Sequence, residues 1–144
     1  MSLLLRTFPV ITSRSLLSTR PLTRTFRMSS HASADNASIG VHNLTSKKDF
    51  DEALAVKGSL MVVDFFATWC GPCKVIAPQV VEMSNRFKNA RFYKIDVDEL
   101  PAVAQELGIT AMPTFVLFKD GEKVQDVVGA RTAVLEKAIQ THCN

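Results

Sequence analysis

Two cysteines separated by two residues, Cys70 and Cys73, are the residues of this chain most suited to chemistry. They follow an apolar run and begin an amphipathic segment, so the pattern places them at the start of a helix. Free N–H groups and the positive end of the helix dipole stabilise a thiolate there, which lowers the pKa of Cys70. Cys73 lies one turn further in, where it is too shielded to react first but can attack a mixed disulfide on Cys70. Pro72 stiffens the turn between them, and Gly71 removes bulk where a partner approaches.

The same spacing also occurs in zinc and iron–sulfur sites, which need further ligands. The third cysteine, Cys143, is far along the chain, and the three histidines, His31, His42 and His142, form no paired motif. For the same reason, a protease nucleophile supported by a histidine is disfavoured. The pattern therefore favours thiol–disulfide exchange, with no metal, and Cys143 is interpreted as an incidental thiol near the terminus.

An acidic residue, Asp64, interrupts the apolar run over residues 60–66. If its carboxyl group is buried, desolvation raises its pKa, and the group can carry a proton to and from Cys73. The alternative is an edge residue that reaches solvent, and the local sequence does not decide between the two. Lys94, on the next expected strand, moderates the charge of Asp64 if both side chains point the same way.

Two further features are ambiguous at the local level. Pro113 in Met112-Pro113-Thr114 sits where a proline opens a strand, and X-Pro bonds are mostly trans, so the local sequence favours trans. Asp96, Asp98 and Glu99 are interpreted as a solvated loop whose acids favour the start of the next helix, rather than as a metal site.

Expected strands and helices alternate in the first part of the folded segment, and a hairpin and a last helix follow. Ser46 and Asp49 form a capping arrangement before a helix, Asp120-Gly121 is a tight two-residue turn, and Thr132 is expected to cap the last helix. Strands are expected through Val41 and over 60–67, 91–97, 114–119 and 122–128, with helices over 47–57, after Cys70, over 100–107 and from Thr132 onward. This order predicts an α/β fold with a mixed sheet and helices on both faces.

The charge of the chain is unevenly distributed. All charged residues before Asp35 are arginines: Arg6, Arg14, Arg20, Arg24 and Arg27. In the remainder of the chain, acidic residues outnumber basic ones, so nothing favours binding to nucleic acid. No run approaches the ~18 apolar residues of a membrane span.

The N-terminal composition predicts a mitochondrial transit peptide over residues 1–28, since it is rich in Arg, Ser and Thr and lacks acids. A secretory signal is the alternative, but no long apolar block is present. Cleavage is expected near Arg24–Ser29, and Met28 offers a start for a shorter cytosolic form. Residues 29–37 are small and polar and predict a flexible linker, so the folded domain is expected over residues 38–144.

From roughly Ile39 to the C-terminus, the sequence resembles the thioredoxin family. The resemblance is carried by Val63 through Lys74, Lys94-Ile95-Asp96-Val97-Asp98, Met112-Pro113-Thr114-Phe115 and Val128-Gly129-Ala130. It implies a three-layer α/β/α thioredoxin fold with a central mixed five-stranded sheet and four helices. One departure is Phe66, where many relatives have tryptophan.

The resemblance also implies roles for individual residues. Cys70 resembles the attacking cysteine, Cys73 the resolving cysteine and Asp64 the buried proton-transfer carboxylate. Pro113 resembles a cis-proline that faces the sulfurs, which reverses the local preference for trans. The residues that resemble a flat surface for docking substrate proteins are Trp69, Gly71, Pro72, Met112, Gly129 and Ala130.

The partners implied by the resemblance are an NADPH-dependent thioredoxin reductase and protein disulfides such as those of peroxiredoxins. The chain has no Gly-rich dinucleotide fingerprint, so we expect it to bind no nicotinamide or flavin cofactor. We expect a monomer in the mitochondrial matrix. The competing hypothesis is a binding subunit that uses the apolar surface around Trp69, with the cysteines secondary.

Overall fold

A central sheet of five strands organises residues 40–143, the part of the chain that this computed structural model describes. The expected transit peptide (1–28) and linker (29–37) lie outside the described residues. The elements in chain order are β1 (Val41–Asn43), α1 (Lys47–Ala55), β2 (Leu60–Phe66), α2 (Gly71–Arg86), β3 (Ala90–Asp96), α3 (Pro101–Glu106), β4 (Thr114–Lys119), β5 (Glu122–Val128) and α4 (Thr132–His142). The predicted order is confirmed, and the bounds of β4 and β5 agree with those expected.

The strands are arranged in the order β1-β3-β2-β4-β5. β1, β3 and β2 are parallel, whereas β4 is antiparallel to β2 and β5 is antiparallel to β4. β4 and β5 are joined by Asp120 and Gly121, whose φ angles of 54° and 89° are those of a turn that matches the twist of a hairpin. The mixed sheet predicted from the sequence is confirmed.

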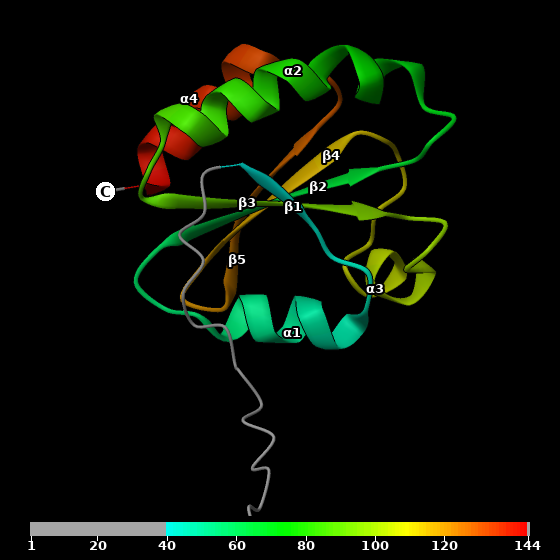
Figure 1. Cartoon of the computed structure of the whole chain (residues 1–144), viewed down its shortest axis with the longest axis horizontal. Helices are drawn as coiled ribbons and strands as arrows, with labels where there is room; N and C mark the ends of the chain where they lie inside the picture. The colour runs from blue at the N-terminus through cyan, green and yellow to red at the C-terminus, as the bar shows by residue number, and fades with distance from the viewer. Residues whose placement is uncertain (1–39, 144) are drawn as a thin grey trace, which may run out of the picture. The chain divides into compact units, whose positions relative to one another are not determined.

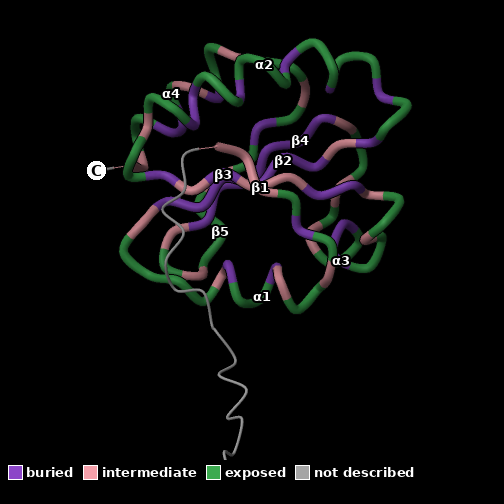
Figure 2. Tube along the Cα trace, viewed as in Figure 1, coloured by how far each residue is buried: buried purple, intermediate pink, exposed green. Residues whose placement is uncertain are grey.

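Helices cover both faces of the sheet (Figure 1). On the face with α2 and α4, a core cluster includes Ile76, Val80 and Leu135, and on the face with α1 and α3 another includes Phe50 and Val103. Residues 60–65 of β2 are all buried, and Figure 2 shows the buried stretches concentrated in the inner strands. This burial explains the nearly continuous apolar sequence of β2. Among the described residues, no helix has the length and apolar character needed to cross a membrane.

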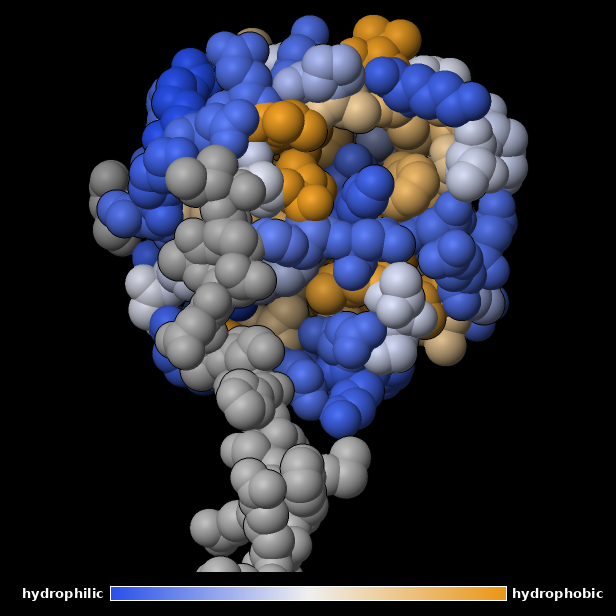
Figure 3. Space-filling view, viewed as in Figure 1, coloured by the Kyte–Doolittle hydropathy of each residue, from blue (hydrophilic) through white to orange (hydrophobic). Residues whose placement is uncertain are grey.

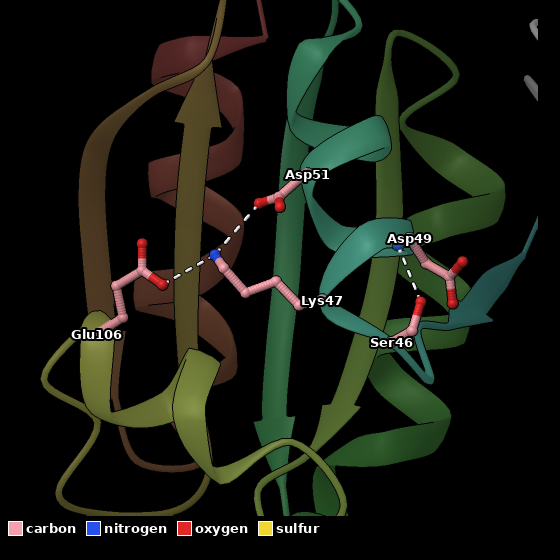
Figure 4. A network of polar contacts seen from close by, with 5 residues as sticks. All are labelled: Ser46, Lys47, Asp49, Asp51 and Glu106. Atoms are coloured by element: carbon pink, nitrogen blue, oxygen red, sulfur yellow. Dashed lines mark hydrogen bonds and ion pairs between the residues drawn. The ribbon is translucent and has the colours of Figure 1, made fainter.

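The start of α1 agrees with the sequence and its end does not. The Ser46 side chain accepts a hydrogen bond from the Asp49 backbone N–H at 3.1 Å, as the capping arrangement predicts. Figure 4 shows Lys47 between Asp51 of α1 and Glu106 of α3, with Nζ–O distances of 3.3 and 2.8 Å, so the ion pair with Glu106 joins the two helices. The helix ends at Ala55 rather than at 57, because the next residue is already extended.

The expected cap of the last helix is wrong. Arg131 is the N-cap of α4, and Thr132 is the first helical residue. The Thr132 hydroxyl instead donates a hydrogen bond to the Gln79 side chain on α2. A contact between helices has therefore replaced the local cap, which a sequence pattern alone does not reveal.

Candidate active site

The two cysteines of the motif form a disulfide at the junction of β2 and α2. Their Sγ atoms are 2.01 Å apart and their Cα atoms 5.4 Å apart. Cys70 is the N-cap of α2, and its Sγ accepts a hydrogen bond from the Cys73 backbone N–H at 3.2 Å. The sulfur of Cys70 therefore lies where free N–H groups and the helix dipole favour negative charge.

The exposed fractions of the cysteines do not separate their roles. Cys70 is 5% exposed and Cys73 is 4% exposed, so the expected stronger shielding of Cys73 is not seen as a difference in exposed area. Their surroundings differ instead. Cys73 lines a cavity of about 370 Å³ together with Asp64 and Lys94, and Cys70 is not among the residues that line it.

The Asp64 carboxyl group is buried in the centre of the sheet. The residue is 7% exposed, which excludes the alternative of an edge residue that reaches solvent. Its Oδ1 has no hydrogen-bond partner among the described residues. Burial raises the pKa of Asp64 to about 7, and the charge of Lys94 opposes this shift. Both protonation states of the carboxyl group are therefore accessible near neutral pH.

Lys94 lies beside Asp64 because the two residues are register partners on β2 and β3. Its Nζ lies 5.5 Å from the centroid of the Phe66 ring, at the end of β2. Lys94 thus faces the cavity, as the sequence analysis required for an effect on Asp64. Phe66 thus supplies an aromatic face for the Lys94 cation.

The Met112–Pro113 peptide bond is cis, so the resemblance was right and the local preference for trans was wrong. Pro113 is buried, and its carbonyl accepts a hydrogen bond from the Gly129 N–H at 2.7 Å. Met112 packs against a small cluster of Ala67, Cys70 and Cys73. The loops before β4 and after β5 are therefore joined to each other, and the first of them borders the disulfide.

The residues expected to dock substrate proteins lie at or near the surface. Trp69 is 67% exposed, Gly71, Pro72 and Ala130 are exposed, and Met112 and Gly129 are half-buried. Met112 is the member of this set that packs against the cysteine cluster. The docking role of the set stays a prediction.

Sequence reasoning missed a second buried acid. Asp96 is 5% exposed, so the interpretation of Asp96, Asp98 and Glu99 as a solvated loop is wrong for Asp96. It also missed that Asp98 accepts a hydrogen bond from the Trp69 indole N–H at 3.0 Å. Within residues 40–143, no three His, Cys, Asp or Glu residues are grouped so as to hold a metal ion.

Comparison with known proteins places this arrangement in a family. The thioredoxin family model matches residues 41–141. The chain is 52% identical over 109 residues to "Thioredoxin AMT13" of Alternaria alternata, covering 76% of this chain and 91% of that one.

Solved structures agree with this match. Thioredoxin NaTrxh from Nicotiana alata is 45% identical with a TM-score of 0.71, covering 73% of this chain and 94% of that chain. A chain from a study of the thiol resolving mechanism in yeast mitochondrial 1-Cys peroxiredoxin via glutathione/thioredoxin systems is 40% identical with a TM-score of 0.67, covering 70% and 94%. With its cysteine pair bonded at the head of α2, the chain therefore belongs to the thioredoxin family and acts as a dithiol–disulfide reductase.

Proposed function

We propose that Cys70 attacks the disulfide of a protein substrate and that Cys73 completes the reaction. The Cys70 thiolate forms a mixed disulfide and releases one substrate sulfur as a thiolate, which takes up a proton from water. The Cys73 thiolate then attacks the Cys70 Sγ, which releases the second substrate sulfur and leaves the Cys70–Cys73 disulfide. Two electrons pass from this chain to the substrate. The observation that carries this assignment is the hydrogen bond from the Cys73 N–H to the Cys70 Sγ at the first turn of α2.

Asp64 is proposed to exchange a proton with Cys73. The resolving step needs the Cys73 thiol to lose its proton, and the reverse step returns one. Support for Asp64 comes from the cavity that it shares with Cys73 and from its pKa of about 7, which allows both uptake and release near neutral pH. Lys94 lines the same cavity and favours the ionised carboxylate.

The substrate is proposed to dock on Trp69, Gly71, Pro72, Met112, Gly129 and Ala130, beside the cis Pro113. These residues combine exposed aromatic or apolar surface with little bulk, which suits contacts with many different proteins. The bonded pair of loops at Pro113 and Gly129 gives this surface a fixed edge.

The proposed electron source is an NADPH-dependent flavoprotein thioredoxin reductase, and the proposed clients include peroxiredoxins. Support comes from the family match and from the similarity to a chain studied with a mitochondrial 1-Cys peroxiredoxin.

We propose further that residues 1–28 direct the protein to the mitochondrial matrix and that Met28 starts a cytosolic form. The Arg-rich, acid-free composition of that segment supports the proposal. Mass spectrometry of the protein from purified mitochondria tests it, since an intact Met1 would refute cleavage.

Turnover of insulin disulfides with dithiothreitol as the reductant tests the assignment of the cysteines. Cys70→Ser should abolish turnover, and Cys73→Ser should slow it strongly, because dithiothreitol must then resolve the mixed disulfide in place of Cys73. Cys143→Ser is the matched control, since Cys143 is a free thiol that packs against the α2 and α4 core rather than the redox cluster. Undiminished turnover by the Cys70 variant would support the competing hypothesis of a binding subunit.

A further inference from the structure

Trp69 and Asp98 lie beside each other because they follow the ends of two neighbouring strands. Phe66 and Asp96 are register partners at the carboxyl ends of the parallel strands β2 and β3. The pairing continues one residue beyond, because the Val97 N–H donates to the Phe66 carbonyl at 2.9 Å. The segments that follow both strands therefore leave the sheet side by side, one with Trp69 and the other with Asp98.

The indole of Trp69 is held by one hydrogen bond from its polar edge. Its Nε1–H donates to Asp98 Oδ2 at 3.0 Å, although the residue is 67% exposed. An exposed side chain without such a partner samples several rotamers. When a substrate docks, fixing one of these rotamers costs conformational entropy, which weakens binding. The bond has the length of a normal hydrogen bond, so the Asp98 acceptor oxygen favours a single orientation of the ring next to Cys70.

Asp98 is in turn held by the buried Asp96. The Asp98 backbone N–H donates to Asp96 Oδ1 at 2.9 Å, which is the geometry of an Asx turn. The Asp96 carbonyl accepts hydrogen bonds from the N–H groups of Glu99 and Leu100 at 3.2 and 3.0 Å. Asp96 is 5% exposed and does not line the cavity of Asp64, so the redox chemistry does not account for this buried acid.

We propose that Asp96 and Asp98 are positioning residues for substrate docking. The Asp96 carboxylate fixes the backbone of Asp98, and the Asp98 carboxylate fixes the indole of Trp69 in the orientation that the substrate meets. The inference rests on the docking role proposed for Trp69. Since the effect requires a hydrogen-bond acceptor rather than a negative charge, asparagine is a functional replacement at both positions.

Fluorescence isolates the positioning step, because Trp69 is the single tryptophan of the chain. In the oxidised full-length protein, Asp98→Ala should lower the anisotropy of Trp69 and shift its emission to the red as the indole gains freedom and water. Asp98→Asn retains an acceptor oxygen and should match the wild type. Asp96→Ala should resemble Asp98→Ala more weakly, and Asp96→Asn should restore the wild-type signal. Thermal unfolding of each variant checks that the fold is retained.

Kinetics with a disulfide-containing protein substrate test the consequence for docking. Asp98→Ala should raise KM about fivefold, the size of effect expected from the loss of one ordinary hydrogen bond, with kcat nearly unchanged. Asp98→Asn should retain the wild-type KM. A general structural defect would lower kcat or stability and would not be rescued by asparagine.

Three results would overturn the proposal, each for a different reason. Unchanged anisotropy in Asp98→Ala would show that the carboxylate does not orient the indole. Equal defects in the alanine and asparagine variants would show that charge, and not the acceptor, matters. An unchanged KM in Trp69→Ala would remove the docking role of Trp69 itself, whereas the fluorescence change between the wild type and Asp98→Ala would still appear.

Discussion

At the scale of single residues, the Asp64 carboxyl group connects the redox site with the stability of the fold. Its pKa is about 7 in the folded protein, against an ordinary value of 3.8. Between these two values the folded state retains a proton that the unfolded state has lost, so stability falls as the pH rises through this window. Above pH 7 both states are ionised, and the loss of stability is complete.

We therefore expect Asp64→Asn to stabilise the protein at pH 8. The full penalty of ionising the buried Asp64 is about 4 kcal/mol, and we expect about 2 kcal/mol to be recovered because the amide is also poorly satisfied there. Urea unfolding of the oxidised protein at pH 5 and pH 8 measures this, and the gain should be much smaller at pH 5. Equal gains at both pH values would contradict the raised pKa.

The same variant should lose activity while it gains stability. Asn cannot exchange a proton with Cys73, so reduction of a protein disulfide should slow by at least about tenfold.

The residue types around Asp64 predicted only part of its environment. Its place in an apolar run pointed to a raised pKa, but the sequence could not choose between burial and an exposed edge. The choice depends on helices covering both faces of β2, which is a property of the whole sheet.

At the scale of elements, Arg91 of β3 completes the end of α1. The last turn of α1 has no basic residue. Arg91 instead donates hydrogen bonds to the Ala53 and Val56 carbonyls at 3.0 and 3.1 Å and to the Ser59 hydroxyl at 2.7 Å. A cation from a neighbouring strand thus satisfies carbonyls that a helix end leaves without partners.

Arg91→Met should lower the free energy of unfolding by about 2 kcal/mol, since three acceptors, two of them in half-buried hydrogen bonds, lose a charged donor. Amide hydrogen exchange in α1 should quicken more than exchange in α2. The matched control is Arg86→Met, which removes an ion pair between Arg86 and Glu136 at 2.9 Å. Because the Arg86 side chain is half exposed, this loss should cost less than about 1 kcal/mol. Equal losses in the two variants would argue against this account of Arg91.

The elements also show where prediction from sequence succeeds and fails. β4 and β5 could be placed because turn chemistry at Asp120-Gly121 is local. The end of α1 and the start of α4 could not, because Arg91 and Gln79 act on them from other elements. The cis bond before Pro113 followed from the resemblance alone, since the local preference of an X-Pro bond is trans.

At the scale of the whole molecule, the edges of the sheet favour a monomer. β1 is three residues long, and β5 carries the charged residues Glu122, Lys123 and Asp126 along its exposed edge. Short and charged edge strands oppose pairing between sheets. On the face seen in Figure 3, hydrophilic side chains separate smaller hydrophobic areas, as expected for a surface without a large permanent interface.

The full-length protein should therefore sediment as one species near its chain mass of 15.9 kDa. Cys143 is the described free thiol, so Cys143→Ser in parallel identifies any disulfide-linked dimer. A dimer that persists in this variant under reducing conditions would show that the edges or the docking surface associate.

Trapping of a mixed disulfide tests the central claim most directly. In a Cys143→Ser background, Cys73→Ser should form a stable 1:1 adduct with a disulfide-containing protein, with the new bond at Cys70 as mapped by peptide mass spectrometry. Cys70→Ser should form little or none. Equal adducts through Cys73, or no adduct on Cys70, would contradict the assignment of the attacking sulfur to the head of α2.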